Sequence, residues 1–478
     1  MVAAAVFVSN LDLFIVNVAL PAMRQHFHGS TLATLSWVLN GYAIVFAALL
    51  VPAGRLADRI GHRKVFLAGL TVFTVASVLC ALAPAVGWLD AARVLQAAGA
   101  AALTPTSLAL LLDATPAAER PGAIRAWASI GGIAAGLGPV LGGLLVEADW
   151  RWVFVVNVPV GIAAVVVGGR VLPGPRGRED GPLPDLFGAG LLTAAIAAVA
   201  VALVKGHEWG WGSARVLGGL LAAVLLTVWF LRRSARHRAP IVELPLLRVP
   251  SFAAANTAAL LFTVAFAGML LTSVLWCQQV WEYSAMRTGL AIAPGPLLVP
   301  PVALGSAALV RRLGPGRLAA LGTLLFAAGI GWWTATIGVS PGYATELLPG
   351  MLLTGLGVGL TLPTLIGSAA AALPPARFAT GSAITTMGRQ IGAVVGVALM
   401  VSLIGTPDGP QAVLDGFRRG WTALIVAALL ACAATLVLAA AARRRPAGAL
   451  PGVPSPRPAG AKQAPGGGSK STSTAGPG

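Results

Sequence analysis

The sequence is dominated by long apolar runs that short polar segments separate. A helix of about 20 apolar residues crosses the ~30 Å hydrocarbon core of a bilayer, and only a helix or a closed barrel can satisfy its own backbone there. We therefore expect an all-α polytopic membrane protein with about fourteen transmembrane helices. The runs lie near residues 3–23, 33–53, 65–83, 89–112, 126–146, 153–169, 186–204, 216–231, 252–280, 288–310, 318–338, 346–373, 378–405 and 420–442.

The basic residues are distributed unevenly among the loops. A net charge of +17 could indicate nucleic-acid binding, but Arg and Lys gather in alternate loops, among them 54–64 and 232–248. This positive-inside pattern predicts a multi-pass protein of the cell inner (cytoplasmic) membrane with both termini in the cytoplasm, and no nucleic-acid partner. Residues 1–23 lack a basic leading segment and carry Asp12, so we do not expect cleavage. Their apolar start suggests that a short cytoplasmic lead precedes them.

The spacing of the runs predicts four regions. Residues 1–170 form an N-terminal six-helix bundle, and residues 171–248 form two extra central helices with a basic cytoplasmic loop. Residues 249–445 form a C-terminal six-helix bundle. Residues 446–478 are rich in Pro, Gly, Ala and Ser, and we expect a disordered cytoplasmic tail.

Ionisable side chains are rare inside the predicted spans, where Asp12, Arg93 and Arg389 are the clear cases. Such a residue costs about 2.5–3.5 kcal/mol at a helix centre, so it usually faces water or a partner. A carboxyl group whose surroundings alternate between two sides of the membrane can take up and release a proton. Asp12 is therefore the candidate for proton coupling. The alternative is a structural ion pair with Arg93 or a helix-terminus contact.

Motifs of enzymes and metal sites are missing from the sequence. There is no GxxxxGK[ST], HExxH or nucleophile elbow. The cysteines stand alone, and only His26 and His28 are near neighbours. We expect no cofactor, no metal and no enzymatic activity, so an ion gradient should supply the energy.

The segment GRLADRIGHRK at 54–64 closely resembles the cytoplasmic loop signature of the major facilitator superfamily. The resemblance implies a conformational latch, in which the acidic residue of the loop is held near the start of a helix in the opposite half. The alternative is a positively charged topology anchor. The matching residues are Gly54, Asp58, Arg59, Gly61, Arg63 and Lys64.

Two further segments resemble motifs of this superfamily. Arg93 opens RVLQAAGAA, which is similar to a helix 4 motif whose arginine is implicated in proton transfer. Because arginine does not deprotonate, it would act on a neighbouring carboxylate, with Asp12 the obvious partner. The alternative is a structural hydrogen-bonding residue.

GGIAAGLGPVLGG at 131–143 resembles the motif associated with antiporters. The alternative is generic close packing of a glycine-rich helix. Ala134 stands where the fuller pattern often has glycine. The core of the motif is Gly138, Pro139, Gly142 and Gly143.

Residues 150–161 and 381–399 resemble segments of the fourteen-helix drug:proton antiporter branch, so the resemblance covers about residues 10–400. It implies proton-coupled efflux of small amphipathic molecules, such as antibiotics, by a monomer that alternates its access. With one intramembrane acid, we expect neutral or monocationic substrates. Arg389 would be a polar site of the C-terminal half, for packing or gating. The alternatives are a proton-coupled nutrient importer and a non-transporting membrane sensor.

Overall fold

A computed structural model describes residues 2–116, 119–172, 185–373, 378–405 and 409–443, and all regular structure among them is helical. The first region holds α1 (Val2–His26), α2 (Leu32–Leu35), α3 (Trp37–Ile60), α4 (His62–Ala81), α5 (Val86–Asp113), α6 (Arg120–Ala148), α7 (Trp152–Val155) and α8 (Asn157–Val171). The central pair is α9 (Leu186–Trp209) and α10 (Ala214–Arg236). The rest holds α11 (Leu244–Leu247), α12 (Pro250–Leu275), η1 (Trp276–Val280), α13 (Ala285–Ile292), α14 (Pro294–Gly305), α15 (Ala307–Leu313), α16 (Pro315–Thr336), η2 (Tyr343–Leu347), α17 (Leu348–Ala371), α18 (Phe378–Ile404) and α19 (Pro410–Arg443).

The described helices confirm a multi-pass membrane protein. Thirteen of them, counted over the described residues, are long and apolar enough to cross a bilayer. The remaining expected span, 126–146, falls within α6, whose apolar described part is Gly136–Ala148. The architecture is thus consistent with about fourteen spans. The predicted tail, 446–478, lies outside the described residues.

Two spans differ from the boundaries expected from the apolar runs. The run 288–310 is divided into α13, α14 and α15, and the first of the two breaks falls at Pro294, which has no backbone N–H to continue the ladder of α13. The last span begins much earlier than residue 420. Arg418 and Arg419, which precede the expected run 420–442, lie inside α19, where the neighbouring Phe417 and Trp421 are buried.

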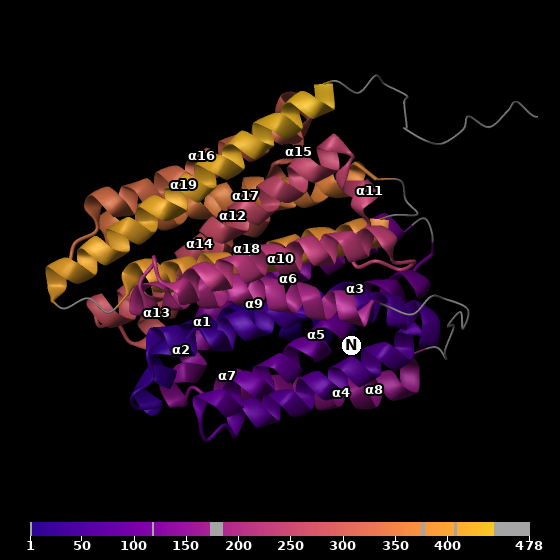
Figure 1. The fold of residues 1–478 in the computed structure, drawn as a ribbon, viewed down its shortest axis with the longest axis horizontal. Coiled ribbons are helices and arrows are strands. Elements are labelled where there is room, and N and C mark those ends of the chain that lie inside the picture. The colour runs from indigo at the N-terminus through magenta and orange to yellow at the C-terminus, as the bar shows by residue number, and fades with distance from the viewer. Residues whose placement is uncertain (1, 117–118, 173–184, 374–377, 406–408, 444–478) are drawn as a thin grey trace, which may run out of the picture. The chain divides into compact units, whose positions relative to one another are not determined.

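The helices pack in two groups, which we call the first and second halves, joined along a seam (Figure 1). In the first half α4 packs on α5 and α8, and α1 packs on α6; in the second, α12 packs on α18, and α17 packs on α14 and α16. The seam is formed where α3 meets α18 and where α6 meets α13 and α14. A central pair of helices completes the arrangement, since α9 lies against both α3 and α18, and α10 packs on α9.

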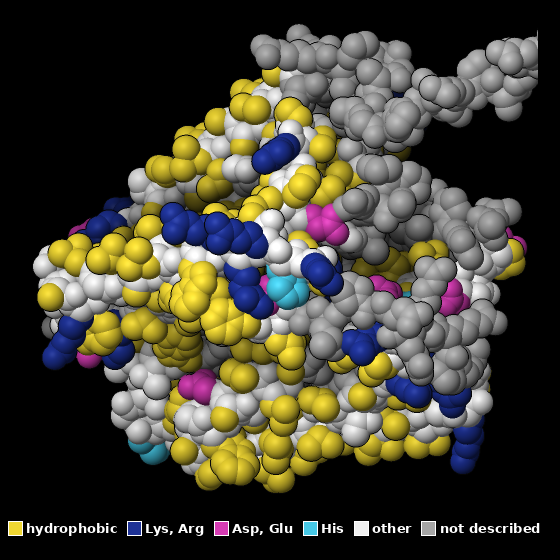
Figure 2. Space-filling view, turned by 45° about the vertical axis from the view of Figure 1, so that its right-hand side comes forward, with side chains coloured by type: hydrophobic (Ala, Val, Ile, Leu, Met, Phe, Trp, Pro, Cys, Tyr) yellow, Lys and Arg dark blue, Asp and Glu magenta, His cyan; other side chains and the backbone are white. Residues whose placement is uncertain are grey.

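Helix α10 presents much of its apolar surface outward. Leu221 and Leu225 are each 60% exposed. Such exposure is costly in water and natural in lipid. Figure 2 likewise shows hydrophobic side chains over broad areas of one face, with Lys and Arg in separate patches.

Candidate functional site

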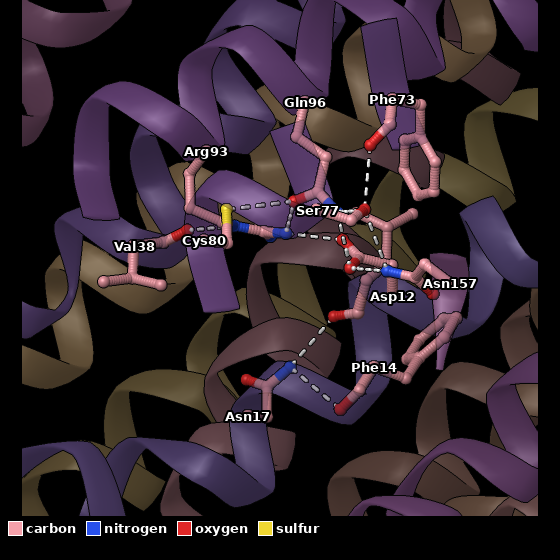
Figure 3. Close-up of polar contacts among 11 residues, drawn as sticks. Asp12, Phe14, Asn17, Val38, Phe73, Ser77, Cys80, Arg93, Gln96 and Asn157 are labelled. Carbon is pink, nitrogen blue, oxygen red and sulfur yellow. Dashed lines mark hydrogen bonds and ion pairs between the residues drawn. The ribbon is translucent and has the colours of Figure 1, made fainter. Parts of the chain in front are cut away.

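A buried polar cluster surrounds Asp12 in the first half (Figure 3). Four helices supply it: Asp12 comes from α1, Ser77 from α4, Arg93 and Gln96 from α5, and Asn157 from the start of α8. All five side chains are at most 1% exposed. The close helix approach that this requires is provided by small residues, for example where Gly69 of α4 faces α5.

The Asp12 carboxylate accepts three hydrogen bonds. Arg93 Nη1 donates to Oδ2 at 2.5 Å, and Gln96 Nε2 and Asn157 Nδ2 each donate to Oδ1 at 3.0 Å. Ser77 Oγ accepts from Gln96 Nε2 at 2.9 Å and donates to the Phe73 carbonyl at 2.8 Å. A buried charge is tolerated when it is paired and hydrogen-bonded, and this carboxylate is both.

Arg93 is held by more than its ion pair. Its Nε donates to the Val38 carbonyl at 3.0 Å, and its Nη1 also donates to Gln96 Oε1 at 2.6 Å. The guanidinium carbon lies 4.1 Å from the ring centre of Tyr42, within cation–π range. These contacts fix the guanidinium independently of Asp12, so the two groups could separate without releasing Arg93 from the core.

The expected contact between Asp12 and Arg93 is confirmed, whereas three polar members of the cluster were not foreseen. The sequence does indicate Gln96 as a member of the cluster, because it follows Arg93 by three residues and so shares its helix face. Asn157 lies within the family-like segment at 150–161, without a charge to single it out. Ser77 had no signal, because serine in a membrane helix commonly bonds to its own backbone.

The predicted latch residues lie where α3 turns into α4. The Asp58 carboxylate is 73% exposed and lies 3.2 Å from His62 Nε2, its salt-bridge partner among the described residues. Arg63 Nη2 donates to the Gly169 carbonyl. Gly61 joins the helices with a φ of +104°, which favours glycine. Residues 374–377, which precede α18 of the opposite half, are outside the described chain, so the latch stays a prediction.

The other latch residues lie around this turn. A Cβ on Gly54 would rest 3.4 Å from Pro105 of α5, so Gly54 marks a close helix contact. Arg59 is half-buried and Lys64 is exposed. Nη2 of the neighbouring Arg55 lies 3.7 Å from Glu243 Oε1. This salt bridge connects the turn to the segment that precedes α11.

The predicted antiporter motif lies on two faces of α6. Gly138 and Gly142 face α1, where added Cβ atoms would stand 2.5 Å from Phe14 Cβ and 3.0 Å from Ile15 Cγ1. Gly143 faces the opposite half instead, and its added Cβ would stand 2.5 Å from the Ala285 carbonyl oxygen. Pro139 contributes a carbonyl against Gly289 of α13. The motif therefore joins the helix that carries Asp12 to the seam between the halves.

A carboxylate reinforces the contact between α6 and α13. Glu147 Oε1 accepts a hydrogen bond from the Met286 backbone N–H at 3.1 Å, in the first turn of α13. A carboxylate at a helix N-terminus is favoured by the helix dipole. Beside this contact a cavity of about 950 Å³ opens at the ends of α1 and α6, and its polar lining includes Gln25, Glu147 and Gln278. We call the α6–α13 contact at Gly143 and Glu147 the seal.

Arg389, the third charge expected inside the spans, lies in α18 and differs from Arg93 in its surroundings. Its Nε is shielded from solvent and has no hydrogen-bond partner among the residues that the structure describes. None of the ion pairs within the described part of the chain includes it. Among the same residues, no three His, Cys, Asp or Glu side chains converge on a common point.

Comparisons with known proteins show what the chain is similar to. The family model "Major Facilitator Superfamily" matches residues 2–185 and 186–397. The chain is 36% identical over 432 residues to a probable actinorhodin transporter of Streptomyces coelicolor, covering 87% of this chain and 74% of that protein. It is 34% identical to the tetracenomycin C resistance and export protein of Streptomyces glaucescens, covering 85% and 76%. It is 35% identical to a cephamycin export protein of Amycolatopsis lactamdurans, covering 84% and 83%.

Solved structures with a similar fold include transporters of another kind. The POT family transporter PepTSo superposes with a TM-score of 0.64 at 18% identity, over 92% of this chain and 97% of that one. A structure of a proton dependent oligopeptide transporter gives 0.63 at 14% identity, over 93% and 98%. At such identities the likeness concerns the fold alone.

Proposed function

This chain belongs to the Major Facilitator Superfamily, and from that premise we propose that it exports small amphipathic molecules, such as antibiotics, in exchange for protons. The family assignment makes it a multi-pass membrane transporter of small molecules. Export is supported by the relatives that are named export or resistance proteins. We further propose that it works as a monomer in the cytoplasmic membrane, with both termini inside.

One observation carries the proton coupling: a single carboxylate lies buried in the middle of a spanning helix. Among the described residues, Asp12 and Asp185 are the buried acids. Asp185 caps the N-terminus of α9, where its Oδ1 accepts a hydrogen bond from the Gly188 N–H at 2.8 Å. The same oxygen lies 2.8 Å from Arg233 Nε in an ion pair. Asp12 has no such terminal role, and an ionisable group at its depth is by default functional.

The cluster provides a way to exchange the proton. While α1, α5 and α8 stay together, three donors engage the Asp12 carboxylate and leave neither of its oxygens without a partner. A movement of α1 that breaks these bonds leaves a bare carboxylate in an apolar site, which favours taking up a proton. Arg93 then keeps its contacts to Val38, Gln96 and Tyr42. We propose that the cluster alternates between these two arrangements.

The seal gives this cycle a mechanical partner. Gly138 and Gly142 pack α6 onto α1 near Asp12, and Gly143 packs the same helix onto α13 of the other half. A movement of α1 that changes the surroundings of the Asp12 carboxylate is thus transmitted through α6 to the seal, which closes one end of the seam. We propose that the loop at Asp58 closes the opposite end in the alternate state. The structural ion pair remains the competing role for Asp12 and Arg93.

Transport by single-site variants decides between the two roles. Inside-out vesicles that contain the protein are given an acidic interior, and the uptake of a panel of fluorescent antibiotics is followed. We expect the wild type to accumulate at least one compound. Asp12→Asn should bind that compound but fail to accumulate it, whereas Asp113→Asn, an exposed acid at the end of α5, should behave as the wild type.

The folding of the variants needs its own control. Asp12→Asn leaves the Arg93 charge without its ion-pair partner, and an unpaired buried charge costs about 3–5 kcal/mol. A double variant, Asp12→Asn with Arg93→Gln, removes both charges and should be the more stable of the two. Gradient-driven accumulation by either variant at the wild-type rate would refute proton coupling through Asp12.

A further inference from the structure

A stripe of polar side chains that includes Arg389 runs along α18. Ser382, Thr386, Arg389 and Gln390 follow one another at helical spacing, and each is half-buried. Arg389 lies about 14 Å along the helix from Thr380, where this span begins, so it is deep within the span. We call these four residues the α18 stripe.

The α18 stripe faces the seam between the halves. On one side of it, Gly392 and Gly396 lie against the backbone of α12, at Leu260 and Val264. On the other side, Ala383 packs with the core cluster of the first half that includes Tyr42 and Phe46 of α3. At 3.6 residues per turn, the stripe falls between these two faces. Substrates of transporters built from two repeats bind at the interface between the repeats.

The charged member of the stripe, Arg389, has no counter-ion within the described chain. Arg93 is matched by Asp12, but the six ion pairs formed by described residues leave Arg389 out, and its shielded Nε lacks an acceptor. A charge at this depth requires water or a partner. The buried acid Asp12 is fully engaged by three donors, so it does not offer its charge to a cationic substrate either.

We propose that the α18 stripe binds an anionic group of the exported molecule, such as a carboxylate or phenolate, through Arg389. A guanidinium presents paired N–H donors that fit a carboxylate, and the hydroxyl and amide groups of Ser382, Thr386 and Gln390 can complete its solvation. The inference rests on the proposed export function and gives it a substrate class. It differs from the neutral or monocationic substrates expected from the sequence, since Arg389, the charge within the spans that has no partner among the described residues, is a cation.

Binding of a matched pair of probes tests the site. Purified protein in lipid nanodiscs is titrated with 1-pyrenebutyrate and with 1-pyrenebutanol, which share the ring and chain and differ in charge. The wild type should bind the carboxylate at least about tenfold more tightly than the alcohol, as a charge-assisted hydrogen bond implies. Arg389→Gln should remove this preference and leave the alcohol affinity unchanged. Arg389→Lys, which keeps the charge but not the paired donors, should retain part of it.

Two results would overturn the proposal. One is a wild type that binds both probes equally, and the other is an Arg389→Gln variant that loses both affinities together, which a packing role predicts. The exposed Arg311→Gln serves as the control and should leave both affinities unchanged. If the preference depends on Arg389 but a pH gradient drives no uptake of either probe, the anion site stands and the export function fails.

Discussion

Adding a single methyl group to the seal between α6 and α13, by the substitution Gly143→Ala, should have an effect whose size can be worked out from the structure. In Gly143→Ala the new Cβ would stand 2.5 Å from the Ala285 carbonyl oxygen and 2.9 Å from Met286 Cα. Both are backbone atoms, so rotamer changes cannot relieve the overlap and α13 must move away. Overpacking of this kind costs about 1–3 kcal/mol. The cost applies only while the seal is closed, because the two helices separate when it opens.

The expected result is a shift of the conformational equilibrium. A difference of about 1–3 kcal/mol corresponds to about 5–150-fold in population toward the open seal. Gly136→Ala on the same helix is the matched control, since its Cβ would lie 3.6 Å from the Pro296 carbonyl oxygen, an ordinary contact. Transport by Gly143→Ala should fall at least about fivefold, while Gly136→Ala should transport nearly as the wild type.

Spin labels report the movement directly. Leu144 of α6 and Leu290 of α13 are both 52% exposed, so labels there leave the core intact. Pulsed electron spin resonance should give a longer distance between them in Gly143→Ala than in Gly136→Ala. Identical distance distributions in the two variants would refute the idea that Gly143 holds the seal closed.

Two further variants test neighbouring contacts. Glu147→Ala removes the acceptor for the Met286 N–H and should open the seal in the same spin-label assay. Glu147→Gln keeps an oxygen acceptor and should stay closer to the wild type. Equal distance distributions in these two variants would exclude a role for this hydrogen bond. Asn157→Ala removes one of three donors to Asp12 and should lower the stability of the folded protein by about 1.5–3 kcal/mol, as measured by denaturant titration in nanodiscs. Ser77→Ala should cost less, since Ser77 reaches the carboxylate only through Gln96 and Asn157, and the reverse order would contradict the described cluster.

Much of the fold was predictable because the bilayer restricts it. A run of about 20 apolar residues in lipid has few options other than a helix, so counting runs gave the spans. Proline breaks and helix ends were less predictable. Arg418 and Arg419 suggested a loop, yet α19 continues through them because Phe417 and Trp421 pack against Trp276, which the sequence alone does not place nearby.

Only the charged residues of the candidate site could be predicted from the sequence. Asp12 and Arg93 attract attention because charge is rare in membrane spans, and opposite charges in one bundle are expected to meet. Gln96, Ser77 and Asn157 carry no such signal, since uncharged polar residues occur in many membrane helices. Their role depends on how α4, α5 and α8 are rotated toward α1. The same holds for Gly143, whose contact with the opposite half follows from the tertiary arrangement rather than from the motif.

Proton movement on addition of a substrate tests the central claim most directly. Inside-out vesicles with an acidic interior are loaded with a pH-sensitive dye, and a panel of antibiotics is added to the wild type and to Asp12→Asn. Coupled export predicts that at least one compound releases protons from wild-type vesicles and that the same compound produces no release with Asp12→Asn. Equal proton release by the two proteins would contradict the account.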